Sequence, residues 1–155
     1  MPTGQPAAAD ALARLAAFVG EWTEQVTFPG AAPIETRGRT VFEWELGGQF
    51  LLERSQWPHP DFPDSMAIIA AGPDGASYAR HYFDARGVVR VYTMSFGDGV
   101  WTLVRDAPDF TPLEFAQRFT GRFADDGRTI DGAWETARDG AGWEHDFKLT
   151  YTKIT

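Results

Sequence analysis

The sequence contains no cysteine, which excludes disulfide bonds and thiolate metal sites. No apolar stretch approaches the ~18 residues that a membrane-spanning helix requires. The opening residues lack both the basic start and the long apolar run of a signal peptide. These absences lead us to expect a soluble, cytoplasmic protein.

Positive charge is also scarce. Lysine and arginine number 14 against 22 acidic residues, so the formal net charge is −8. Because nucleic acids and anionic membranes attract basic surfaces, we expect neither as a partner. Nucleophile elbows, phosphate-binding loops, zinc spacings and dinucleotide fingerprints are all missing. The partner that remains is a small molecule, and the aromatic content of 14% suits either a large core or an aromatic-lined pocket.

The length of 155 residues predicts one domain over residues 7–155, preceded by a flexible tail over residues 1–6. A short amphipathic helix is expected to begin at Asp10, a suitable N-cap, and to end before Gly20. Its apolar positions recur at helical spacing and are Leu12, Leu15, Ala16 and Val19.

After Gly20 the apolar period changes to two, which is the period of a half-buried strand. Turn sequences such as "GPDG" and "GDG" separate ten runs rich in Val, Ile, Thr and aromatic residues. The expected strands are 21–28, 36–46, 49–57, 65–71, 77–84, 88–96, 99–106, 113–124, 128–136 and 143–153. Short loops favour antiparallel hairpins, and closure leaves no sheet edge to protect. We therefore predict an all-β fold, a ten-stranded antiparallel up-and-down barrel whose helix plugs one end.

Alternation predicts which side chains point into the barrel. On the last strand the apolar face is Trp143, His145, Phe147, Leu149 and Tyr151, so a histidine interrupts an otherwise apolar set. Short turns on either side of 128–136 predict a row across three strands, made of Phe119, Trp134 and His145. The sequence therefore predicts His145 on an aromatic wall inside the barrel.

On two other strands the alternation does not separate apolar from polar residues cleanly. Glu24 falls on the apolar face of the first strand, and pairing of the first strand with the last is expected to bring Trp22 near Tyr151 and Phe28 near His145. The strand 77–84 leaves two alternatives open. Either Tyr78, Arg80 and Tyr82 point inward, or Ala79, His81 and Phe83 do.

Two segments resemble a known superfamily. "LAAFVGEW" followed by "FEWELGGQFLLERSQW" resembles a lipocalin-like family of unknown function within the calycin superfamily. This calycin-like resemblance implies that Trp22 packs at the closed end of the barrel. The chain is also distantly similar to nitrobindin, and that resemblance implies haem held by His145. It departs from nitrobindin at residues 23–25, where bulkier residues replace spaced glycines, and from fatty-acid-binding barrels in lacking an arginine within 149–151.

The leading hypothesis is a binding module for a small, apolar or amphipathic molecule, with no cofactor. Its candidate ligand-binding residues are His145, Trp134, Phe119, Gln117, Trp44, Tyr92, Arg105 and Glu24. One alternative is a haem protein with His145 as iron ligand, and another is a cofactor-free isomerase, cyclase or hydrolase using His145 or Glu24. The purely structural alternative to these roles is that His145 is a hydrogen-bonded core residue and that Glu24 pairs with an inward Arg54 or Arg105. A homodimer formed through the outer barrel faces is a further hypothesis.

Overall fold

The computed structural model describes residues 5–138 and 141–155. Helix α1 (Gln5–Arg14) continues into a 3₁₀ turn, η1 (Leu15–Phe18). The helix therefore begins earlier than the predicted cap at Asp10, because the alanine-rich start favours helix and a proline in the first turn lacks only an N–H that would have no partner there. Of the predicted tail, residues 1–4 lie outside the described residues. No helix in the described ranges is both long and apolar enough to cross a membrane.

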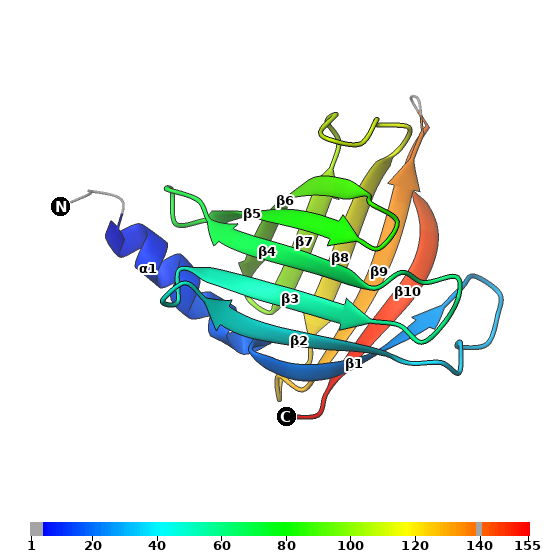
Figure 1. The fold of residues 1–155 in the computed structure, drawn as a ribbon, viewed down its shortest axis with the longest axis horizontal. Coiled ribbons are helices and arrows are strands. Elements are labelled where there is room, and N and C mark those ends of the chain that lie inside the picture. Colours follow the sequence, from blue (N-terminus) through cyan, green and yellow to red (C-terminus); the bar gives the residue numbers. More distant parts are fainter. Residues whose placement is uncertain (1–4, 139–140) are drawn as a thin grey trace.

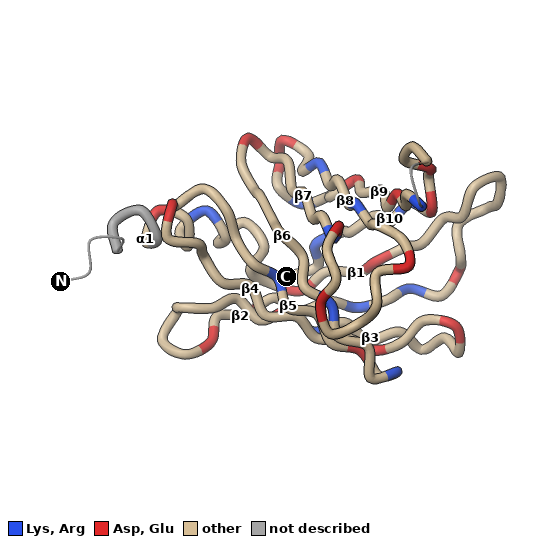
Figure 2. Tube along the Cα trace, turned by 90° about the horizontal axis from the view of Figure 1, so that it is seen from above, with Lys and Arg blue, Asp and Glu red and all other residues tan. Residues whose placement is uncertain are grey.

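Ten strands follow the helix and form a closed barrel, which confirms the predicted architecture (Figure 1). Each strand pairs antiparallel with its neighbour in the chain, and β1 pairs with β10 to close the ring. The strands are β1 (Gly20–Thr27), β2 (Gly38–Glu45), β3 (Phe50–Gln56), β4 (Ser65–Ala71), β5 (Ser77–Asp84), β6 (Val89–Gly97), β7 (Val100–Arg105), β8 (Ala116–Phe123), β9 (Thr129–Ala137) and β10 (Glu144–Lys153). Acidic and basic residues are spread over strands and loops alike (Figure 2).

One end of the barrel is closed by α1 and η1. Leu15 and Phe18 are fully buried in the core, and the Tyr78 hydroxyl on β5 donates a 2.7 Å hydrogen bond to the carbonyl of Ala11. The Trp22 indole N–H donates to the Phe18 carbonyl at 2.8 Å. The tryptophan therefore packs at the closed end, in the place that the resemblance to calycins implied.

The register between β8 and β9 is the predicted one, with Phe119 opposite Trp134. Between β9 and β10 the prediction is wrong, because Trp134 lies opposite Phe147 rather than His145. The register shifts between His145 and Phe147, so Asp146 is an extra residue in β10. A one-residue bulge reverses the faces of the strand on one side of it. His145 consequently lies opposite the outward-facing Glu135 and is exposed.

Two further questions of register are settled by pairing. On β5, Tyr78 and Arg80 are buried while His81 is exposed, so the first of the two alternatives is the one observed. On β1, Glu24 rather than Trp22 lies opposite Tyr151, which moves the predicted closure by two residues. This shift keeps every side chain on its predicted face but changes which side chains meet.

Candidate functional site

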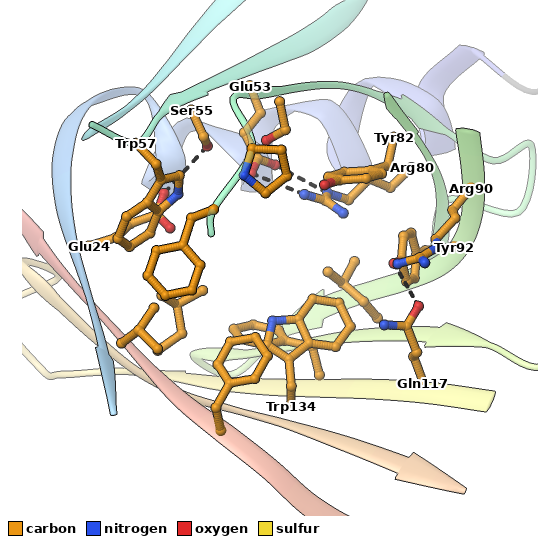
Figure 3. A pocket seen from close by; sticks show the side chains of 18 of the residues that line it. Glu24, Glu53, Ser55, Trp57, Arg80, Tyr82, Arg90, Tyr92, Gln117 and Trp134 are labelled. Atoms are coloured by element: carbon orange, nitrogen blue, oxygen red, sulfur yellow. Dashed lines mark hydrogen bonds and ion pairs between the residues drawn. The ribbon is translucent and has the colours of Figure 1, made fainter. Parts of the chain in front are cut away.

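A cavity of about 270 Å³ occupies the barrel interior on the side away from α1. Pockets for drug-sized ligands measure about 300–1,000 Å³, so this one suits a smaller molecule. Its lining comes from nearly all strands and from the loop between β3 and β4 (Figure 3). The lining residues are Glu24, Val26, Phe28, Glu53, Ser55, Trp57, Phe62, Pro63, Ser65, Arg80, Tyr82, Arg86, Arg90, Tyr92, Trp101, Leu103, Gln117, Phe119, Trp134, Phe147, Leu149 and Tyr151.

One wall of the cavity is aromatic. The Trp134 ring lies 5.2 Å from Phe119 and 5.7 Å from Tyr92, in tilted and edge-on geometry. A Cβ atom at Gly132 would lie 2.6 Å from the Phe119 ring, so the absence of a side chain on β9 is what lets Phe119 lie flat against the sheet. This wall is rigid and apolar, which suits a flat or compact hydrophobic body.

The mouth of the cavity is also aromatic. Phe62 packs against Trp57 at 5.1 Å and against Phe28 at 6.3 Å. The Trp57 ring lies over Gly38, where a Cβ would approach it to 2.4 Å. Phe28 in turn contacts Phe147 at 5.8 Å, so rings from β10, from the residue that follows β1 and from the β3–β4 loop surround the entrance.

A polar cluster lies on the wall formed by β1, β3 and β5 (Figure 3). The Arg80 guanidinium donates from Nε and Nη2 to the two carboxylate oxygens of Glu53, at 3.1 and 3.0 Å. It also lies over the rings of Tyr82 and Tyr92, at 5.5 and 5.4 Å. Burial opposes the charge of Arg80, but the Glu53 carboxylate and its hydrogen bonds more than offset burial and raise the pKa of Arg80 above its usual range.

Glu24 stands beside this ion pair without a cation of its own. The side chain is 4% exposed, and its one hydrogen bond comes from the Ser55 hydroxyl at 3.4 Å. Burial and the Glu53 charge raise the pKa of Glu24 to about 8, while Ser55 and the Arg80 charge offset only part of this shift. The carboxyl group therefore favours its protonated form at neutral pH, and the ion pair with Arg54 or Arg105 that the sequence predicted is not formed.

Tyrosine hydroxyls complete the polar surface. Burial, together with the charges of Glu24 and Glu53, raises the pKa of Tyr151 well above its ordinary value. On the opposite side, the Tyr92 hydroxyl donates a 3.0 Å hydrogen bond to the side-chain carbonyl of Gln117. Two buried donors of lining residues, Nε of Arg90 and Nε1 of Trp101, have no hydrogen-bond partner in the described part of the chain. Such donors are available to a ligand's acceptor atoms.

Five of the eight predicted site residues line the cavity, namely Trp134, Phe119, Gln117, Tyr92 and Glu24. Trp44 does not, because it lies six residues along β2 from Gly38, the residue opposite Glu24. At about 3.3 Å per residue this places it roughly 20 Å nearer the closed end. There its ring packs against the core that α1 and η1 cover.

Arg105 is the second predicted residue outside the cavity. Its guanidinium is buried, but Nε and Nη2 donate to Asp109 at 2.9 and 2.8 Å. Hydrogen bonds from this arginine, and from the backbone N–H groups of Thr111 and Val91, hold the pKa of Asp109 well below its usual range. Arg105 therefore anchors the β7–β8 loop at the rim. Neither it nor Arg54, which is exposed and pairs with Glu43, reaches Glu24.

His145 is the third predicted site residue that lies outside the cavity. Its outward position, caused by the bulge in β10, removes it from the cavity. The residues do not fit haem, because no histidine lines the cavity in the part of the chain that the structure describes. Nor does any group of three or more His, Cys, Asp or Glu suited to a metal ion occur within residues 5–138 and 141–155.

Sequence reasoning missed the ion pair at the centre of the cluster. Alternation along β3 places Leu51, Glu53 and Ser55 on one face, but the buried Leu52 lies in the opposite phase and obscures the pattern. For Arg80, the alternation along 77–84 left open whether the side chain points inward or outward. The pairing of Ile69 with Arg80 across the β4–β5 turn is what fixes its direction.

Comparisons with known proteins place the fold but no function. No family model matches the chain, and no curated protein matches it in sequence. Among solved structures, the chain is similar to Rv2717c from M. tuberculosis, with a TM-score of 0.66 and 15% sequence identity. The match covers 94% of this chain and 98% of that chain. At this identity the similarity supports the closed barrel fold alone.

Proposed function

We propose that this protein binds a small, largely apolar molecule inside the barrel. The observation that carries the proposal is the cavity of about 270 Å³, whose wall and mouth are aromatic and whose inner surface holds a confined polar cluster. Burying apolar area against such walls contributes about 25 cal/mol per Å². The few polar groups then fix the orientation of the ligand, as in binding pockets generally.

Unsatisfied donors support the same proposal. A buried N–H without a partner costs about 1–3 kcal/mol, and two lining residues, Arg90 and Trp101, carry one each. A ligand acceptor that reached either donor would recover that cost. A ligand with an acceptor at either position would therefore bind more tightly than one without it.

The test uses intrinsic fluorescence, because Trp57, Trp101 and Trp134 all line the cavity. Small aromatic probes should change the emission and saturate. In Val26→Phe, which fills the cavity from β1, the saturable change should be lost. Val41→Phe on β2 is the matched control, since Val41 is only half-buried and does not line the cavity. Equal binding by both variants would refute an interior site.

Acid–base catalysis by Glu24 is a second candidate. A buried carboxyl with a pKa of about 8 exchanges its proton near neutral pH, which is the requirement for a general acid or base in a cofactor-free isomerase, cyclase or hydrolase. A crystal structure with a bound native ligand tests this role. A ligand with no ionisable or electrophilic atom in contact with the Glu24 carboxyl would exclude it.

A further inference from the structure

The charged side chains of the cavity wall do not balance around Glu24. Two carboxylates, Glu24 and Glu53, share one neighbouring guanidinium. The Arg80 Nε and Nη2 atoms both donate to Glu53, so that ion pair is complete by itself. None of the salt bridges within residues 5–138 and 141–155 includes Glu24.

The elements packed around Glu24 offer it no other cation. On β2 the residue opposite is Gly38, and on β10 it is Tyr151. Ser55 on β3 donates one long hydrogen bond and is itself held by Thr40 at 2.7 Å. Two other arginines line the cavity. Arg90 on β6 lies on the opposite side of the ring of strands (Figure 3), and Arg86 in the loop after β5 forms an ion pair with Asp84 at 2.7 Å. In the free protein a proton supplies the missing positive charge.

We propose that the ligand is an amine, whose protonated nitrogen binds the Glu24 carboxylate while its apolar body packs against the aromatic wall. This inference rests on the proposed binding function and names the chemical class of the ligand. An ammonium group replaces the proton as the counter-charge of Glu24. A neutral ligand leaves Glu24 protonated, and an anionic group there would face the carboxylates of Glu24 and Glu53.

Other features of the cavity favour the same class. Trp134 and Tyr92 line the cavity, and their rings offer apolar surface to the body of the amine. The net charge of −8 raises the local concentration of cations around the whole molecule. The volume of about 270 Å³ suits an amine with one ring system.

The proposal predicts how many protons are released when the amine binds. The amine enters as an ammonium ion, and Glu24 releases its proton to solvent, so one proton leaves per ligand bound while Glu24 is protonated. With a pKa of about 8 for Glu24, the competent ionised form is a minor species at pH 6 and half of the population at pH 8. Apparent affinity should therefore rise about fifty-fold between these two pH values.

The experiment compares three probes of similar size and different charge: 2-phenylethylamine, 2-phenylethanol and 3-phenylpropanoate. Binding to the full-length protein is followed by tryptophan fluorescence and by calorimetry at pH 6 and pH 8. Calorimetry at pH 6 in bis-tris and in phosphate, two buffers with different ionisation enthalpies, reports protons released, a readout that needs no variant. We expect the amine to bind at least about tenfold more tightly than the alcohol at pH 8 and to release one proton at pH 6.

Glu24→Gln should abolish both the preference for the amine and the proton release, and Glu45→Gln, on the exposed outer face of β2, should change neither. Equal affinity for amine and alcohol, or tighter binding of the carboxylate, overturns the amine proposal but leaves the binding function standing. Failure of all three probes to bind overturns both.

Discussion

At the scale of single residues, Glu24 shows how position rather than residue type sets chemistry. The sequence has 22 acidic residues, most of them on the surface, where ionisation costs little. Glu24 differs because it is buried on the inner face of β1 beside another carboxylate, and both circumstances raise its pKa to about 8. Glu53, equally buried, is matched by Arg80. The ion pair with Arg80 therefore gives Glu53 a structural role, whereas Glu24, which has no such pair, is left able to exchange its proton or bind a ligand.

This difference predicts how stability depends on pH. The folded-state pKa of Glu24 lies above its unfolded value, so the folded state binds more protons between about pH 4.5 and 8. The stabilisation is fully present below that window and is lost as the pH rises through 8. At about 1.4 kcal/mol per pKa unit, the loss over the whole window amounts to about 5 kcal/mol.

Urea denaturation at pH 5 and pH 8.5 measures this loss. Glu24→Gln should remove most of the difference between the two pH values, because glutamine does not ionise. Contributions from other groups, such as Asp109, cancel when the variant is subtracted from the wild type. A wild type whose pH dependence matched that of Glu24→Gln would contradict the assigned burial.

His145 contrasts with Glu24, because its side chain is exposed and is expected to affect neither stability nor binding. Because it is exposed and outside the cavity, His145→Ala should change the free energy of unfolding by less than about 0.5 kcal/mol and leave probe binding unchanged. Titration with haem should give the same absorption spectra for wild type and variant. A Soret band shift that disappeared in His145→Ala would show that this histidine reaches the cavity after all.

At the scale of elements, one extra residue in β10 determines which way the side chains at the start of the strand point. With Asp146 as an extra residue, the alternation of Phe147, Leu149 and Tyr151 does not extend back to His145. The outward face is then stabilised by its own contacts. Arg118 forms an ion pair with Glu135 at 3.0 Å and lies 4.4 Å from the Trp143 ring. These contacts hold the bulged segment on the outer surface.

On β9, the contact between Gly132 and Phe119 gives a test of packing. A Cβ at Gly132 would lie 2.6 Å from the Phe119 ring and 2.8 Å from the Leu149 carbonyl oxygen. Because the backbone carbonyl cannot move aside, Gly132→Ala should destabilise the protein by about 1–3 kcal/mol and displace Phe119 into the cavity. Gly97→Ala is the control, since a Cβ there meets nothing within 4 Å. Thermal unfolding and probe binding measure both effects, and equal melting temperatures for the two variants would contradict the packing.

At the scale of the whole molecule, closure and the N-terminal cap divide the barrel into two halves. Near α1 the interior is filled by interlocking rings, with Phe18 within 5.3 Å of Phe42, Phe96, Trp101 and Phe123. Farther from the helix the same barrel contains the cavity. The filled half supplies the cohesion that allows the other half to remain open.

Phe18→Ala tests this division. Removing a fully buried phenylalanine from the closed end should cost about 4 kcal/mol of stability, as for other Phe-to-Ala changes in cores. Phe110→Ala, at a side chain that is 78% exposed, should cost almost nothing. Chemical denaturation compares the two. If both variants lost the same stability, the cap would not be part of the core.

The sequence by itself determined the class of fold. A period of two broken by short turns favours antiparallel hairpins. An open sheet of ten strands would leave two edge strands unpaired, so the pattern favours a closed barrel, which is what the structure shows. It also identified most of the aromatic wall, because Phe119, Trp134 and Tyr92 follow clean alternation and the turn between β8 and β9 is short. Local pattern was sufficient wherever face and register followed from neighbouring residues.

Tertiary structure alone decided the chemistry of the site. The bulge that turns His145 outward, the phase of β5 that turns Arg80 inward, and the register that places Glu24 opposite Tyr151 each depend on pairing between strands. A shift of one residue reverses a face, and a shift of two changes every partner along it. Charge pairing inside the barrel depends on both, so which carboxylate lacks a cation is set by the closed barrel and not by the order of residues.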